Sequence, residues 1–210
     1  VNELKQIYGR MGINVWDVID AAKTKPFGFM PFYPGPGLGG HCIPIDPFYL
    51  TWKAREYNVP TLFIELAGEV NAAAPRLAID ALVEALSVKR QKSLHGAKIL
   101  LLGMAYKKNV DDMRESPSLT ILEMLEARGA NVEYFDPYIP VIPMTREHAP
   151  LAGRKSIGWS KDAVSAFDAA LICTDHDNVD YAALGEWLPL VVDTRNAMRA
   201  VPNRERIVLA

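Results

Sequence analysis

The chain has 210 residues, half of them hydrophobic, which is enough to bury a core in one or two domains. Its formal net charge is −2, so composition gives no electrostatic case for a nucleic-acid partner or for an anionic membrane surface. No apolar run reaches membrane-spanning length and the first residues do not form a signal peptide, so we expect a cytoplasmic protein. Two cysteines, Cys42 and Cys173, stand in different contexts and do not indicate a disulfide framework.

The first segment, residues 1–23, carries apolar side chains near helical spacing, and Gly12 marks the point where one helix would end and a second begin. The first helix opens without a start methionine or a capping residue. We therefore expect the chain to be a fragment whose amino-terminal part is missing.

A glycine-rich loop, Gly35-Pro-Gly-Leu-Gly-Gly-His-Cys-Ile-Pro-Ile-Asp46, comes next. Glycine permits positive φ and close approach of a ligand to the main chain, and proline stiffens the segment, so the composition indicates a shaped binding loop and not a flexible tether. Its letters partly fit a dinucleotide-binding fingerprint. That motif must follow a buried strand and open a helix, and the aromatic, proline-rich residues 27–34 exclude it.

Cys42 is the candidate nucleophile of this loop. A lone cysteine is most often a small buried apolar residue, but backbone N–H groups of a glycine-rich loop could stabilise a thiolate or an oxyanion here. Asp46 followed by Pro47 is also typical of a helix N-cap with proline at the first helical position, and the two roles are compatible. His41 is the weaker candidate, because a base adjacent in sequence points elsewhere unless the turn reverses it.

Two helices are predicted after the loop, over residues 47–57 and 61–86. The second is apolar on more than one face, which is typical of a domain connector packed against something else, here a second subunit. Pro75 lies inside it and is expected to kink or divide it. A mostly polar and basic linker, residues 87–95, follows.

Strands alternate with helices beyond this linker, which predicts a doubly wound parallel sheet. Cys173 lies inside one strand and is expected to belong to the core. Ligands bind beyond the carboxyl ends of such strands, so the segments that follow them are the candidate site segments. The predicted strands are residues 98–103, 131–135, 169–174 and 190–194, and the predicted helices are residues 118–128, 160–167 and 181–188.

The first strand is followed by Met104-Ala-Tyr-Lys-Lys-Asn-Val-Asp-Asp-Met-Arg-Glu-Ser-Pro117. Ser116-Pro117 is typical of a helix start, whose free N–H groups favour an anion, and Lys107, Lys108 and Arg114 add positive charge. A solvated charged loop is the ordinary interpretation of any one of these lysines. The group as a whole, at this end of a strand, predicts phosphate binding.

Two further groups follow later strands. Arg195 ends the fourth strand and is predicted at the ligand edge, although a strand-terminal arginine is often only a surface ion-pair partner. Asp175-His176-Asp177 follows the third strand. Three adjacent residues in an extended loop do not converge easily on one ion, and no further His/Cys cluster supports them, so we interpret them as a turn and predict no metal site.

The run from Pro34 to Phe48 and the run from Gly103 to Pro117 resemble two motifs of the UDP-glucose/GDP-mannose dehydrogenase family, and the first is most similar to its UDP-N-acetylhexosamine 6-dehydrogenase branch. The resemblance extends from Val1 to about Asn196. It implies an α/β fold: an all-helical central and dimerisation region over residues 1–90, and then a doubly wound, Rossmann-like UDP-binding domain over residues 91–210. The family's NAD-binding domain has no counterpart in this chain.

The family's chemistry implies roles for individual residues. A cysteine attacks the C6 aldehyde formed by a first hydride transfer to NAD, and the thiohemiacetal is oxidised to a thioester and hydrolysed to a uronate. By this resemblance Cys42 is the nucleophile and Asp46 the carboxylate that assists water or proton transfer. The residues implied to bind the NAD cofactor are Cys42, Ile43, Pro44, Ile45 and Arg114. Those implied to bind the UDP-sugar substrate are Tyr33, Pro34, Gly35, Pro36, Gly37, Leu38, Gly39, Tyr106, Lys107 and Arg195.

One residue of the family's pattern has no clear match in this chain. The family's neighbouring subunit donates a substrate-binding arginine from a position upstream of the loop, and the nearest basic residue here is Lys25. Pro34, Pro36 and His41 favour an N-acetylated sugar over UDP-glucose. The sequence leaves open which hexosamine is used and whether the expected homodimer is part of a larger assembly. A nucleotide-sugar binding and dimerisation module without chemistry is the alternative function. A cysteine hydrolase is disfavoured, because no histidine partner is evident beyond His41. We expect residues 1–210 alone to be inactive.

Overall fold

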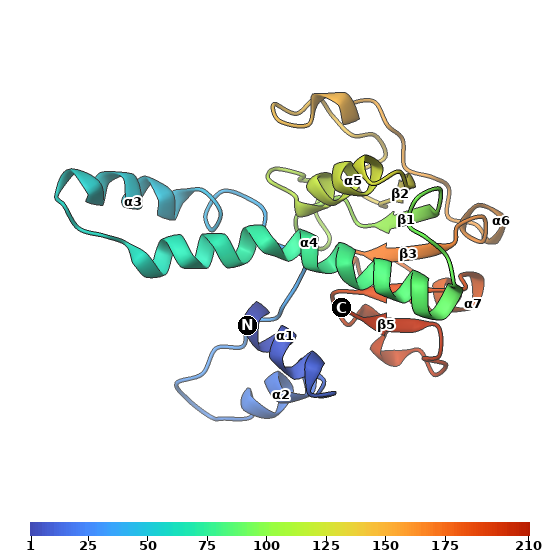
Figure 1. Cartoon of the computed structure of the whole chain (residues 1–210), viewed down its shortest axis with the longest axis horizontal. Coiled ribbons are helices and arrows are strands. Elements are labelled where there is room, and N and C mark those ends of the chain that lie inside the picture. The colour runs from blue at the N-terminus through green and yellow to red at the C-terminus, as the bar shows by residue number, and fades with distance from the viewer.

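A computed structural model describes all 210 residues as a five-stranded sheet with seven α-helices (Figure 1). The helices are α1 (Asn2–Arg10), α2 (Val15–Ala22), α3 (Asp46–Glu56), α4 (Leu62–Arg90), α5 (Pro117–Ala127), α6 (Lys161–Val164) and α7 (Tyr181–Trp187). The strands are β1 (Lys98–Leu102), β2 (Asn131–Phe135), β3 (Ala169–Ile172), β4 (Val191–Asp193) and β5 (Ile207–Leu209), and two short 3₁₀ turns cover Ala149–Leu151 and Ala197–Ala200.

All neighbouring strands of the sheet are parallel, in the order β2-β1-β3-β4-β5. Alternate side chains of β1 enter two separate cores, because successive residues of a strand point to opposite faces. Ile99 and Leu101 pack with α4 and α5, whereas Leu100 and Leu102 pack with α6 and α7. The predicted doubly wound parallel sheet is thereby confirmed, and Cys173 is fully buried in the first core, as expected.

Helix α4 belongs to two parts of the molecule. Its carboxy-terminal half contributes Ile79, Leu82 and Leu86 to the core beneath the sheet. Its amino-terminal half projects away from the sheet and is accompanied by α3, so the two form a protruding arm (Figure 1). Gly68 of α4 lies directly against the ring of Phe48, which permits this close approach of the two helices.

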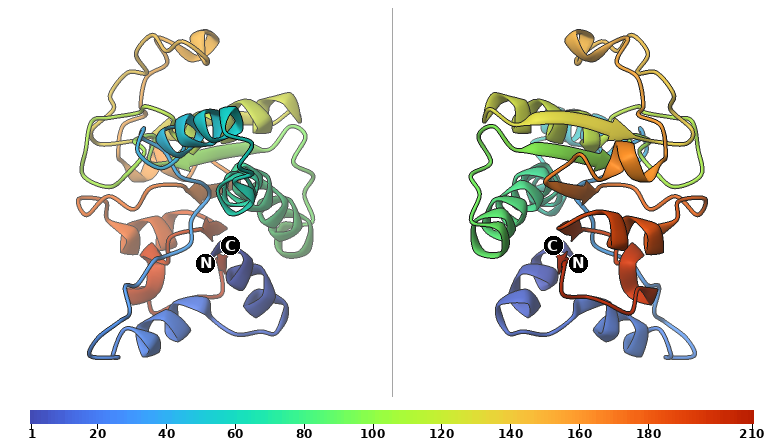
Figure 2. Two further views of the ribbon diagram at one scale, coloured as in Figure 1. Left: turned by 90° about the vertical axis from the view of Figure 1, so that its left-hand side faces the viewer. Right: turned by 90° about the vertical axis from the view of Figure 1, so that its right-hand side faces the viewer.

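Helices α1 and α2 pack near the edge of the sheet that β5 forms. Val15, Trp16 and Ile19 of α2 form a small cluster with Tyr8 and with Leu209 of β5. Figure 2 shows this helix pair beside β5, whereas the segment between β2 and β3 projects beyond the other edge. The two ends of the chain are therefore close together in space.

Most predicted elements are present, with four corrections. Asp46 is not an N-cap: Ile45 occupies that position, Asp46 is the first helical residue, and no side chain caps α3. Pro75 does not divide α4, which is one helix of 29 residues. That helix also continues to Arg90, so the first residues of the expected linker are helical. The predictions omitted β5, whose three residues are too few to show a period.

None of the helices combines the length and the apolar composition needed to cross a bilayer.

Candidate functional site

The glycine-rich loop packs directly against residues that follow the carboxyl ends of β1 and β4. A Cβ atom on Gly35 would overlap the guanidinium of Arg195, and one on Gly39 would lie 2.5 Å from Cβ of Tyr106. A Cβ on Gly37, whose φ is +136°, would lie 2.8 Å from Cβ of Pro117. These glycines are required because no larger residue fits between the loop and the sheet domain.

A backbone hydrogen bond and a turn fix the end of this loop. The N–H of Gly40 donates to the carbonyl of Arg114 at 2.8 Å. The carbonyl of His41 then accepts from the N–H groups of Ile45 and Asp46, at 3.0 and 3.1 Å, so the chain turns back on itself around Cys42. Cys42 is exposed at the outside of that turn. A free thiol on an ordered, ligand-accessible loop is the arrangement that a nucleophile needs.

The charged groups beside Cys42 form a compact pair. Arg114 donates to Asp112 through Nη2 at 2.6 Å and through Nε at 3.0 Å. Hydrogen bonding with Asp112 raises the pKa of Arg114, and Cys42 makes a smaller electrostatic contribution in the same direction, so the thiol lies within range of this cation. The hydrogen bond from Arg114 is also the main reason that the pKa of Asp112 is lowered, although its partial burial opposes this.

The predicted cations after β1 do not all remain free for an anion. Lys108 pairs with Asp177 at 2.9 Å and Arg114 with Asp112, whereas Lys107 has no carboxylate partner and lies over the ring of Tyr106, 5.6 Å from its centroid. Ser116 caps α5 as predicted, accepting from the N–H of Ser118. Lys107 is thus the cation of this segment that is free to meet a phosphate.

Arg195 lies at the centre of the loop contacts. Its Nε donates to the carbonyl of Cys173 at 2.8 Å, and its own N–H donates to Asp193 at 2.9 Å. Burial lowers the pKa of Arg195, with nearby acidic groups opposing the shift. Gly35 contacts the guanidinium, so Arg195 is brought together with the loop as the sequence predicted for the ligand edge.

Two residues of α1 that were not predicted as site residues complete this corner. Asn2 accepts a hydrogen bond from the N–H of Gly35 at 3.3 Å. Lys5 is half-buried, and burial together with repulsion from Arg195 lowers its pKa to about 8. Both depend on contacts between residues far apart in the chain, which no local pattern signals.

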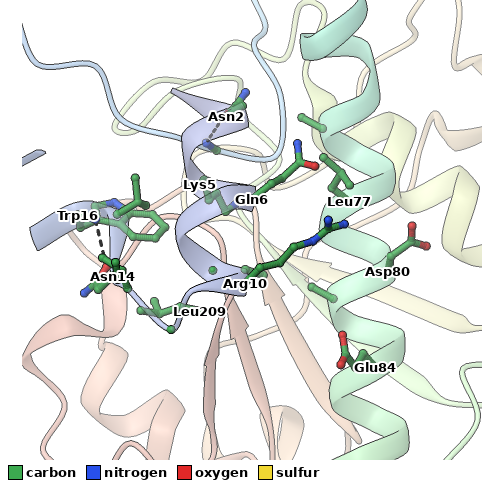
Figure 3. A pocket seen from close by; sticks show the side chains of 18 residues that line it. Asn2, Lys5, Gln6, Arg10, Asn14, Trp16, Leu77, Asp80, Glu84 and Leu209 are labelled. Atoms are coloured by element: carbon green, nitrogen blue, oxygen red, sulfur yellow. Dashed lines mark hydrogen bonds between the residues drawn. The ribbon is translucent and has the colours of Figure 1, made fainter. Parts of the chain in front are cut away.

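A cavity of about 790 Å³ opens between α1, α4 and β5, on the side of Gly35 that Asn2 and Lys5 occupy (Figure 3). Arg10 extends into it from α1, and Asp80 and Glu84 line it from α4 (Figure 3). A second hollow of about 730 Å³ lies beside His41, between the Arg114 segment and residues 143–148. The glycine loop therefore has space on both sides.

The remaining predicted residues divide by exposure. Tyr33, Leu38, Cys42, Ile43, Asp46 and Lys107 are exposed, Ile45, Pro44, Gly39 and Tyr106 are half-buried, and Pro34, Gly35, Pro36 and Gly37 are buried. The turn after β3 covers Asp177 and Asn178, and His176, just before it, is fully buried, so the predicted turn begins later than expected and leaves out Asp175. The structure thus brings together the loop, the segment after β1 and the end of β4.

This is an α/β protein with a parallel sheet, a class whose members bind ligands beyond the carboxyl ends of the strands, where the glycine-rich loop lies here. Two family models match the chain: the central domain of the UDP-glucose/GDP-mannose dehydrogenase family over residues 1–73, and the UDP binding domain of that family over residues 100–200. The chain belongs to the UDP-glucose/GDP-mannose dehydrogenase family.

Named relatives support this assignment. The chain is 38% identical over 176 residues to a UDP-N-acetyl-D-glucosamine 6-dehydrogenase of Pseudomonas aeruginosa, covering 84% of this chain and 40% of that protein. It is 33% identical over 205 residues to a UDP-N-acetyl-D-mannosamine dehydrogenase of Methanococcus maripaludis, covering 94% and 44%. A solved UDP-D-ManNAc dehydrogenase from Pyrococcus horikoshii superposes with a TM-score of 0.81 at 30% identity, covering 98% and 46%. The chain spans less than half the length of these relatives.

Proposed function

We propose that the protein containing this chain is an NAD-dependent nucleotide-sugar 6-dehydrogenase, which oxidises the C6 alcohol of a UDP-N-acetylhexosamine to the carboxylate. The observation that carries the proposal is the packing of the Gly35–Gly40 loop against Arg195, Tyr106 and Pro117, which leaves the Cys42 thiol exposed beside the family's UDP-binding domain. Residues 1–90 would then be the helical central region and residues 91–210 the UDP-binding domain.

The proposed substrate site uses the groups that meet at the ends of β1 and β4. Lys107 supplies a free cation for the pyrophosphate, Tyr106 a ring for stacking, and Arg195 a guanidinium for the nucleotide. Residues from Tyr33 to Gly39 form the wall of the site, and their glycines let the ligand approach the backbone. The names of the relatives favour an N-acetylated hexose.

The proposed chemistry passes through the sulfur of Cys42. The thiolate adds to C6 of the aldehyde, forming a thiohemiacetal. Loss of hydride from C6 and of the hydroxyl proton gives a thioester, which water cleaves to the carboxylate and the free thiol. Asp46, exposed on the first turn of α3, would accept the proton of that water.

The same surface fits the cofactor that this chemistry requires. Ile43 is exposed and offers an apolar surface for a nicotinamide ring, Pro44 and Ile45 continue that surface, and Arg114 is an exposed cation for the anionic part of a dinucleotide. NAD, when bound, would accept a hydride from C6 at each of the two oxidation steps. The chain's own part is to hold C6 at Cys42 while this occurs.

We also propose that the protein is a homodimer joined through its protruding arm. Several large apolar side chains on α3 and on the amino-terminal half of α4 are exposed, and groups of such side chains mark interaction surfaces. They include Tyr49, Leu50, Trp52, Leu62, Phe63 and Leu66. In a homodimer, the apolar side chains of one arm would pack against the same side chains of a second copy.

Alkylation of the native full-length protein separates the enzyme from a binding module without chemistry. Iodoacetamide is expected to label Cys42 rapidly, and a saturating UDP-N-acetylhexosamine should slow that labelling at least about tenfold because the sugar covers the thiol. Cys173 is the internal control, since burial raises its pKa to about 12. Labelling of Cys42 that is slow, or fast but indifferent to the nucleotide sugar, would favour the binding module.

A further inference from the structure

The segment that carries Tyr106 and Lys107 is tied down on its amino-terminal side by one buried carboxylate. Asp136, directly after β2, accepts from the N–H groups of Met104 and Ala105 at 2.6 and 3.0 Å. It also accepts from the N–H groups of Tyr138 and Ile139 at 2.8 and 3.1 Å. Asp136 is 2% exposed, so these bonds are not shared with bulk water.

His176 joins this carboxylate to the other side of the segment. Its ring is fully buried after β3, with Nε2 3.1 Å from Asp136 and Nδ1 2.9 Å from the backbone N of Asn109. A backbone N–H can only donate, so Nδ1 is the acceptor and the ring proton lies on Nε2, which donates to Asp136. His176 is therefore a neutral bridge between the ends of β2 and β3 and the backbone of Asn109.

Further bonds reinforce both ends of the segment. Thr174 donates its hydroxyl to the carbonyl of Ala105 at 2.7 Å. Asn109 and Asp177 bond reciprocally, side-chain amide to carboxylate at 2.6 Å and backbone N–H to amide oxygen at 3.0 Å. The side chains of Tyr106 and Lys107 lie between these two sets of anchors. Their backbone position is thus set by residues after β2 and β3.

The anchored segment also supports the nucleophile loop. Tyr106 is the surface against which Gly39 and Gly40 pack, and its N–H donates to the carbonyl of Asp112 at 2.9 Å. Arg114, two residues further, accepts from Gly40 through its carbonyl. A shift of Tyr106 would therefore move the backbone immediately ahead of Cys42.

We propose that Asp136 and His176 are positioning residues, which act through the backbone of residues 104–109 to hold Tyr106 and Lys107 against the nucleotide and the glycine loop against the sheet. This inference rests on the proposed function, because it assumes that those two side chains grip a uridine nucleotide. It gives a role to Asp136 and to a histidine that the sequence indicated only as a turn residue.

The electrostatics of the pair agree with this geometry. Burial alone would raise the pKa of the Asp136 carboxyl, but its hydrogen bonds from His176 and from the backbone outweigh burial and lower that pKa. The carboxylate is therefore ionised at neutral pH and satisfied by five donors. A buried network whose members are all satisfied rigidifies the segments that it joins.

Two matched substitutions of His176 separate positioning from simple core filling. His176→Asn keeps an acceptor near Nδ1 for Asn109 but loses the donor to Asp136, whereas His176→Gln keeps a donor near Nε2 but loses the acceptor for Asn109. Positioning through Asn109 predicts that His176→Gln weakens UDP binding to the chain about tenfold, while His176→Asn stays within about threefold of wild type. The reverse order would mean that His176 merely satisfies a buried carboxylate, and it would overturn the positioning role assigned to His176.

Asp177→Ala keeps the proposal testable if His176→Gln does not fold, because Asp177 is exposed. Its loss should weaken UDP binding by about threefold and speed amide hydrogen exchange in residues 104–112. Glu56→Ala, which breaks a comparable exposed pair with Lys53 on α3, should change neither quantity. Unchanged binding and exchange in Asp177→Ala would overturn the inference. Full-length wild-type protein that fails to bind UDP would instead refute the proposed function, and the inference with it.

Discussion

The contact between Gly35 and Arg195 is among the closest that the glycine loop makes with the sheet domain. Gly35→Ala would put a methyl group into the guanidinium, which is also held by the carbonyl of Cys173. Arg195 must then move, so we expect UDP affinity to fall roughly tenfold or more and the free energy of unfolding to fall by about 1–3 kcal/mol. Calorimetric titration with UDP and thermal unfolding measure both effects.

Gly158→Ala is the matched control for that change. Gly158 lies in an exposed loop, has no positive φ, and a Cβ there would meet no atom within 4 Å. It should bind UDP as wild type does. Equal affinity in Gly35→Ala would show that the close approach of loop and guanidinium has no part in nucleotide binding.

The environment of Lys5 predicts how the free energy of unfolding depends on pH. Its pKa of about 8 lies below the usual 10.5, first because of burial and then because of Arg195. Between these two values the unfolded chain holds a proton that the folded chain has lost, so Lys5 makes stability rise with pH across pH 8–10.5, and its cost is fully present below pH 8. Lys5→Met should therefore be more stable at pH 7, by on the order of 1–3 kcal/mol.

The measurement is thermal or denaturant unfolding of both proteins at a series of pH values. Subtracting the two curves removes every other group that titrates in the same range. The stability advantage of Lys5→Met should shrink steadily from pH 8 to 10.5. An advantage that is constant with pH, or absent at pH 7, would contradict the assigned environment of Lys5.

Local patterns and distant contacts differ in how well the sequence predicts them. Cys42 and Arg195 could be selected because glycine spacing and a strand end mark their positions, whereas Tyr106 is indicated by the family resemblance alone. The Asp46 cap was misassigned by one residue, since Asp-Pro fits either the cap or the first helical turn. Lys5, Asn2 and the Asp136–His176 pair could not be found, because their roles exist only once distant segments meet.

At the scale of elements, the arm formed by α3 and α4 exposes large apolar side chains that an isolated chain leaves in contact with water. Its helices were predicted from their spacing, but an apolar helix can face a core or a partner, and the period does not distinguish the two. The structure separates them: Ile79, Leu82 and Leu86 face the sheet, whereas Leu62 and Phe63 are exposed.

Phe63→Glu tests whether the arm is an interface. Phe63 is 88% exposed, so a charge there should leave the fold of one chain intact and yet be costly in an apolar contact between two arms. We expect wild type to sediment as a dimer and Phe63→Glu to dissociate at least about tenfold more readily. Val88→Glu, an exposed position at the far end of the same helix, should remain dimeric. A monomeric wild type, or equal dissociation of both variants, would refute the arm interface.

At the scale of the whole molecule, the conformation of the glycine loop is set by its contacts with the sheet domain. β1, β3 and β4 end at one edge, and the segments beyond β1 and β4 contact Gly35, Gly39 and Gly40. The glycine loop has no core of its own, so its geometry depends on the sheet domain against which it packs. The proposed nucleotide contacts and the exposed thiol are in this way parts of one surface.

The acyl-carrier role of Cys42 is tested most directly by the mass of its peptide during turnover. Full-length protein with Asp46→Asn, in which thioester hydrolysis should be slowed, would be mixed with NAD and a UDP-N-acetylhexosamine and quenched in acid. The account predicts a Cys42 peptide heavier by the UDP-N-acetylhexosaminuronyl group and no such adduct on Cys173. Continued formation of the uronate with Cys42 never acylated would contradict it.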